Sequence, residues 1–175
     1  VDPDGNRIVV GSWFGRVLAK FGVKNFEHKT QERLSYLKSI SPELNNAISA
    51  LESNNDIVVN ILPMSECKEV SKGATISLEN GNSTIYYHED SGFLVDNDYS
   101  SPNAILAHEL GHAENNMNGT NIKYNHDEAR AINGDIETKR KGNANEQKSI
   151  YYENLVRRIE GSNERSYEYY KINEQ

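Results

Sequence analysis

Residues 107–113 read Ala-His-Glu-Leu-Gly-His-Ala, and this stretch constrains the chain more than any other. The pattern His-Glu-x-x-His within a helix is typical of zinc metallopeptidases. Positions i and i+4 of an α-helix lie on one face, so His108 and His112 can bind the same metal ion. Glu109 lies about 100° round the helix from His108, beside the metal. The stretch therefore predicts zinc held by His108 and His112, with Glu109 as the base acting on a zinc-activated water.

The surrounding residues predict that this stretch lies in one well-defined helix. Ser101 is suited to cap its N-terminus, and Pro102 follows as the first helical residue. At about 100° per residue, Leu106, Leu110 and Met117 fall on the face opposite the two histidines. We therefore expect the helix to pack these three side chains into the core and to turn its imidazoles into a cleft.

A third zinc ligand is expected from the segment after this helix. Asn125 can cap a helix that begins at His126, and Glu128 would share the inward face of that helix with Ile132. An inward carboxylate needs a partner, because burying it unpaired is costly, and zinc would supply one. Glu128 is therefore the expected third ligand. Asp127 and His126 remain alternatives, and Glu128 could instead be the partner of Asn125 in a capping box.

Composition limits the classes of partner. The chain has 175 residues and a net charge of −7, which argues against nucleic acid and against an anionic membrane surface. No apolar run approaches the roughly 18 residues that a membrane span requires. Cys67 is the only cysteine, so no disulfide can form within the chain. We expect one domain with a modest core.

The hydrophobic pattern predicts an α+β fold. Helices are expected over 30–39, 41–53 and 146–160, with a break in the chain at 142–145 before the last of them and with strands over 56–62, 74–79, 83–88 and 93–95. A small mixed sheet from residues 56–95 would be backed by helices, with the metal helix packed on it. Strand 83–88 is our candidate for the edge strand, which in zincins pairs with extended substrate. His88 at its end is a possible further ligand.

The start of the chain carries a first resemblance. Asp2-Pro3-Asp4-Gly5-Asn6 resembles the end of the repeat core in bacterial RHS/YD-repeat proteins, where such a segment precedes a variable C-terminal toxin domain. The chain also opens on Val1, so we expect it to be a piece of something longer. The resemblance implies a junction at residues 1–14 and a zincin-like toxin domain at 15–175.

Three later segments together resemble the effector peptidase family M91, typified by an NleD-type bacterial effector. They are Leu106–Ala113, the pair Asp127-Glu128 opening a helix, and Glu153-Asn154-Leu155-Val156-Arg157 followed by Gly161, Arg165 and Tyr167. Residues 129–134 depart from the family's pattern, which leaves the third ligand open.

The resemblance implies a zinc endopeptidase that acts as a toxin or effector. It would be secreted within a larger carrier, cleave a protein in the target-cell cytoplasm and be neutralised in its producer by an immunity protein. Arg165, Tyr167 and His126 are candidates for stabilising the oxyanion, although Arg165 and Tyr167 could simply clamp the C-terminal tail. The rival hypothesis is a binding module with a structural zinc or none, which docks a partner through its Tyr-rich C-terminus. A closed zinc site would need a fourth ligand such as His88 or His126.

Overall fold

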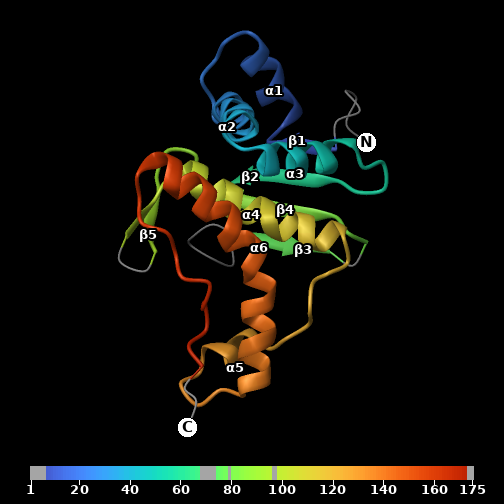
Figure 1. The fold of residues 1–175 in the computed structure, drawn as a ribbon. Coiled ribbons are helices and arrows are strands. Elements are labelled where there is room, and N and C mark those ends of the chain that lie inside the picture. Colours follow the sequence, from blue (N-terminus) through green and yellow to red (C-terminus); the bar gives the residue numbers. More distant parts are fainter. Residues whose placement is uncertain (1–6, 68–73, 79, 96–97, 173–175) are drawn as a thin grey trace.

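A first short strand is followed by a group of helices, then by a run of short strands and then by a second group of helices, an α+β arrangement as the sequence predicts (Figure 1). The computed structural model describes residues 7–67, 74–78, 80–95 and 98–172. The helices are α1 (Trp13–Lys20), α2 (Phe26–Ile40), α3 (Pro42–Ser53), α4 (Pro102–Met117), α5 (His126–Arg130) and α6 (Ile136–Glu160). The strands are β1 (Ile8–Val10), β2 (Val59–Pro63), β3 (Ala74–Ser77), β4 (Ser83–Tyr87), β5 (Phe93–Val95) and β6 (Asp98–Ser100), and a 3-10 turn (Met64–Glu66) follows β2.

The main sheet has the strand order β1-β2-β4-β3. Strands β1, β2 and β4 run parallel, and β3 pairs antiparallel to β4, with Thr75 opposite Ile85. The expectation that strand 83–88 forms the edge is therefore wrong: β4 is paired on both sides, and the edges of the sheet are β1 and, beside β4, β3. Strand β3 lies at the edge because β2 already pairs with the other side of β4. Strands β5 and β6 form a separate two-stranded ribbon.

Strand β1 belongs to the sheet although its residues lie within the segment 1–14 that the sequence assigned to a junction. Ile8 and Val10 are buried, and each pairs in parallel register with a residue of β2. The sheet thus begins upstream of residue 15.

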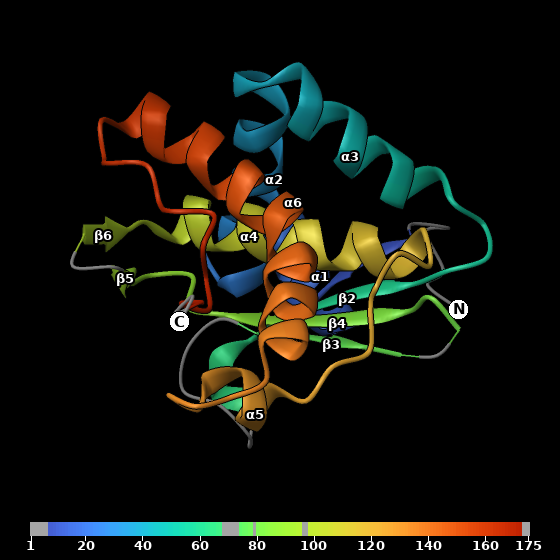
Figure 2. The ribbon, with the colours of Figure 1, turned by 60° about the horizontal axis from the view of Figure 1, so that its bottom comes forward.

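Helix α4 packs over β3 and β4 with its axis nearly along these strands, and α6 crosses α4 (Figure 2). Ser101 Oγ accepts the Ala104 N–H at 3.1 Å, which confirms the predicted cap. Leu106 and Leu110 are fully buried in the core and Met117 packs against it, also as predicted. Helix α4 is therefore anchored to the sheet through the face opposite His108 and His112.

Helix α6 differs from the expected pattern. The sequence predicts a chain break at residues 142–145, but α6 continues through them as a single helix. A Cβ atom on Gly142 would lie 2.4 Å from Cε2 of Tyr170, so this glycine makes room for an aromatic ring and does not end a helix. Tyr170 belongs to the chain after α6, which runs back along the helix toward its start (Figure 1).

Candidate active site

Two histidines of α4 and one glutamate of α6 converge on a point between the two helices. Among the described residues, His108, His112 and Glu146 form the one group able to hold a metal ion. The two Nε2 atoms are 3.2 Å apart, and Glu146 Oε2 lies 3.3 Å from His108 Nε2 and 3.6 Å from His112 Nε2. A tetrahedral zinc ion with bonds of about 2.0–2.1 Å sets its ligand atoms about 3.3–3.4 Å apart. The triangle therefore has the dimensions of three zinc ligands.

The chemistry of the group also fits a cation. Glu146 Oε2 is buried and has no hydrogen-bond donor, an arrangement that costs free energy unless a positive charge faces the oxygen. Burial raises the pKa of Glu146, but the two imidazoles outweigh burial and hold that pKa far below its usual range. Burial likewise lowers the pKa of His108, and Glu146 and Glu153 outweigh it, raising that pKa to about 10. The surroundings thus stabilise positive charge where the three ligand atoms meet.

Glu153 fixes the orientation of His108. Its Oε2 accepts the Nδ1–H of His108 at 3.0 Å, which leaves Nε2 as the ring nitrogen that faces His112 and Glu146. The same oxygen accepts Arg165 Nη1 at 3.0 Å, and Oε1 accepts Arg157 Nε at 2.9 Å and Ser100 Oγ at 3.0 Å. Burial raises the pKa of Glu153, but His108 and Arg165 outweigh it and lower that pKa to about 2. A buried, fully bonded carboxylate therefore holds the imidazole in one tautomer.

A close approach of α4 and α6 brings these carboxylates to the histidines. A Cβ atom on Gly111 would lie 2.7 Å from Cα of Ser149 and 2.9 Å from its Oγ. Glu146 and Glu153 lie three residues before and four residues after Ser149, on the same face of α6. Gly111, which lies within the His-Glu-x-x-His motif, thus lets the neighbouring helix reach the site.

Glu109 is buried beside the edge strand of the sheet. Thr75 Oγ1 on β3 lies 2.7 Å from Glu109 Oε2, to which it donates, and 3.1 Å from the backbone oxygen of Glu109. Glu109 is not a member of the metal group, so its carboxylate is not needed as a ligand. The edge strand and the expected base are therefore neighbours, although the sequence assigned the edge to the wrong strand.

The predicted third ligand, Glu128, does not join the histidines. Glu128 and its alternative Asp127 are exposed on α5, and Glu146 occupies the position that the sequence assigned to Glu128. The inward face expected for Glu128 does not exist, because α5 ends at Arg130 and leaves Ile132 85% exposed. The sequence did contain a signal that Glu146 belongs to the site: Glu146 lies two helical turns before Glu153, and the two carboxylates therefore share one face of α6.

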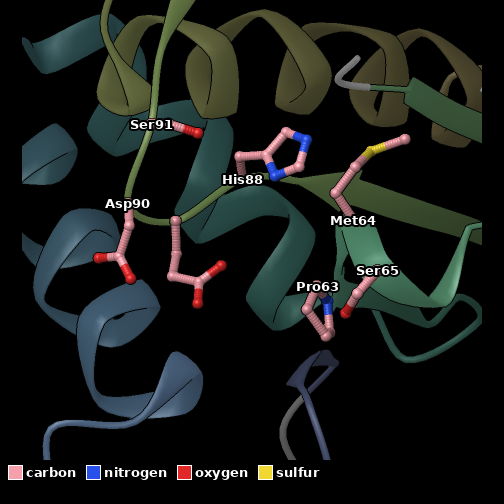
Figure 3. Close-up of a pocket in the computed structure, with 7 residues that line it drawn as sticks. Pro63, Met64, Ser65, His88, Asp90 and Ser91 are labelled. Atoms are coloured by element: carbon pink, nitrogen blue, oxygen red, sulfur yellow. The ribbon is translucent and has the colours of Figure 1, made fainter. Parts of the chain in front are cut away.

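His88 lies apart from the metal group. It lines a cavity of about 520 Å³ at the ends of β2 and β4, together with Pro63, Met64, Ser65, Glu89, Asp90 and Ser91. Figure 3 shows the imidazole of His88 directed toward Met64 and away from Asp90. His108, His112 and Glu146 are not among the residues that line this cavity, so the structure does not bring His88 to that group.

Two of the expected oxyanion donors belong to the C-terminal segment that follows α6. The backbone of Arg165 is paired with Asn154 through two hydrogen bonds of 2.7 and 2.8 Å, and its guanidinium binds Glu153 and lies over the ring of Tyr169. Tyr167 is 44% exposed. Arg165 thus clamps the tail and supports Glu153.

A helix with two histidines one turn apart, a carboxylate from a second helix and a buried glutamate beside an antiparallel edge strand define a metallopeptidase arrangement on an α+β fold. The chain belongs to peptidase family M91, whose family model, described as an effector protein, matches residues 16–166. No curated protein and no solved structure matches the chain.

Membership of this family makes the chain a peptidase of the effector class, which implies a metal, delivery into a target cell and a protein substrate there. In the part of the chain that the structure describes, no helix has the length and apolar character needed to cross a membrane.

Proposed function

We propose that the domain is a zinc-dependent endopeptidase that cleaves a protein of the target cell. The observation that carries the proposal is the triangle of His108 Nε2, His112 Nε2 and Glu146 Oε2, with sides of 3.2 to 3.6 Å. His108, His112 and Glu146 would hold the zinc, and three protein ligands leave a tetrahedral ion one open position for chemistry. When bound, zinc supplies Lewis acidity, which polarises the substrate carbonyl and acidifies the attacking water.

Glu109 is the general base of the proposed reaction. Its carboxylate takes a proton from the attacking water as the water oxygen bonds to the carbonyl carbon. The carbon–nitrogen bond then breaks, and Glu109 returns the proton to the departing amine nitrogen. The hydrogen bond from Thr75 holds the carboxylate in place through these steps, and because Thr75 lies on the edge strand it couples the base to the substrate-binding side.

We place the substrate along β3. As the edge strand, β3 pairs with β4 on one side, so an extended peptide can add to its other side. A peptide bound there would pass next to Glu109, because Thr75 is part of β3 and contacts that carboxylate. The site would therefore take an extended stretch of polypeptide, in keeping with an endopeptidase.

We infer that a larger RHS-type carrier delivers the domain and that the junction lies within residues 1–14, whose residues Ile8–Val10 also contribute strand β1 to the sheet of the domain. The supporting resemblance, Asp2–Asn6, lies outside the described residues, and Cys67 as the only cysteine permits folding in a reducing cytoplasm. The producer would need an immunity protein that covers the cleft. Co-expression of the neighbouring open reading frame should restore growth to cells that express the domain, and failure of every neighbouring frame to do so would argue against this inference.

Cleavage mapping tests the peptidase proposal. A target-cell lysate is treated with zinc-loaded protein or with its Glu109→Gln variant, and new N-termini are identified by mass spectrometry. Wild type should create a small set of new N-termini that Glu109→Gln does not, although both bind zinc equally. Identical sets from the two proteins would refute the proposal and favour a binding module with a structural metal.

A further inference from the structure

Three side chains meet in a closed cluster at the start of α6. Tyr124 Oη lies 3.1 Å from His126 Nδ1 and 3.3 Å from Tyr170 Oη, and Tyr170 Oη lies 3.0 Å from His126 Nδ1. The residues come from the loop before α5, from the first turn of α5 and from the tail after α6. Their polar atoms therefore converge from separate segments, and the roles described above for the active site use none of them.

The cluster lies next to the metal group. The rings of Tyr124 and Tyr170 both pack on Gly142, where an added Cβ would lie 3.1 Å and 2.4 Å from them. Gly142 is one helical turn before Glu146, so the cluster adjoins the ligand on the same face of α6. The side-chain amide of Asn143 fixes Tyr170 in this position: its Oδ1 accepts the Tyr170 N–H at 2.6 Å, and its Nδ2 donates to the Tyr170 carbonyl oxygen at 3.0 Å.

The cluster needs only one of its two tyrosine protons internally, so the other hydroxyl can donate to a bound molecule. Each tyrosine hydroxyl has a single proton, and a neutral imidazole that accepts at Nδ1 has a single lone pair there. Tyr170 can donate to His126 while the Tyr124 proton is directed elsewhere. Tyr170 is 4% exposed and Tyr124 is half-buried, so Tyr124 is the more accessible of the two tyrosines to a bound molecule. Turning its proton outward leaves the contact between Tyr170 and His126 intact.

Local charges keep this proton on Tyr124. Burial raises the pKa of Tyr124, and the hydrogen bond with Tyr170 and the negative charge of Glu146 raise it further. Burial and the cation of Arg130 lower the pKa of His126, which favours the neutral imidazole that accepts at Nδ1. At neutral pH the cluster thus consists of two protonated hydroxyls and one acceptor.

We propose that Tyr124 donates its hydroxyl proton in a hydrogen bond to the oxygen of the scissile carbonyl as negative charge develops there, with Tyr170 and His126 as positioning residues. The proposal rests on the peptidase function above and assigns the oxyanion donor. It also gives His126, expected from the sequence as a ligand or as a donor itself, the role of orienting Tyr124. Arg165 is less suited to this task, because its guanidinium is engaged by Glu153.

The test uses the zinc-loaded domain and a quenched fluorescent peptide that spans the mapped cleavage site. Tyr124→Phe should lower kcat about 100-fold, with KM, zinc content and thermal midpoint unchanged, which is the pattern of an interaction made only in the transition state. Tyr170→Phe keeps the donor and removes one of its neighbours, so its loss should be smaller. Tyr151→Phe, which changes an exposed tyrosine of α6, is the matched control and should keep full kcat.

Two results would overturn the assignment. One is a Tyr124→Phe enzyme with the kcat of wild type, and the other is a fall in kcat that matches a fall in zinc content. The Glu109→Gln variant distinguishes failure of the Tyr124 assignment from failure of the proposed peptidase function. If Glu109→Gln is inactive while Tyr124→Phe is fully active, only the assignment of Tyr124 is wrong. If Glu109→Gln cleaves like wild type, the peptidase proposal fails as well.

Discussion

Replacing Gly111 with alanine tests whether close helix packing builds the metal site. The new methyl group would lie 2.7 Å from Cα of Ser149, whereas contacts closer than 3.4 Å are tighter than ordinary packing. Backbone atoms cannot turn aside as a flexible side chain can. Relief of the clash therefore requires α6 to move from α4 by about 0.7 Å, the difference between these two distances.

Such a movement would open the ligand triangle. If α6 moves directly away from α4, the 3.3 Å between His108 Nε2 and Glu146 Oε2 becomes about 4.0 Å. Two bonds of about 2.0–2.1 Å span that separation only when they point in nearly opposite directions, which a tetrahedral ion does not allow. Glu153 would move with α6 and release His108. Loss of a supporting partner alone typically lowers metal affinity about 10–100-fold, and we expect a loss at least that large.

The measurement is zinc affinity by competition with a chromophoric chelator, together with thermal unfolding of the metal-free protein. Helix propensity alone favours alanine over glycine by roughly 1 kcal/mol, whereas overpacking costs about 1–3 kcal/mol. The metal-free variant should therefore be no more stable than wild type, and its zinc binding should be clearly weaker. An increase in stability with unchanged zinc affinity would show that the helices have room at this position and would refute the reasoning.

Two further predictions concern the carboxylates. Glu146→Gln should lose zinc while its matched control Glu128→Gln keeps one zinc per chain by elemental analysis; the reverse pattern would return the third ligand to α5. Because the folded-state pKa of Glu153 is about 2, against an ordinary value of 4.5, its stabilising contribution is complete above pH 4.5 and is lost as the pH falls toward 2. In metal-free protein the thermal midpoint should therefore fall as the pH is lowered across this range, and the midpoint of the Glu153→Gln variant should fall less steeply. Equal slopes of midpoint against pH for the two proteins would show that Glu153 does not carry the effect.

Local sequence was sufficient for one half of the candidate site. The spacing of His108, Glu109 and His112 was readable because a single helix fixes their relative positions through its 3.6-residue repeat. The same repeat placed Leu106 and Leu110 in the core, and hydrophobic patterning was sufficient for the α+β class.

Tertiary structure decided the other half. Strand β3, not β4, lies at the edge because β4 pairs in parallel with β2 on its other side. No property of residues 83–88 signals this pairing. Gly142 was taken for a break because glycine has low helix propensity, while its role depends on Tyr170, which arrives from 28 residues downstream. Glu146, the third residue of the group that could hold a metal, was missed because a side chain from a second helix is positioned by the approach and rotation of that helix. That approach is set by the contact between Gly111 and Ser149, two residues that are 38 positions apart in the chain.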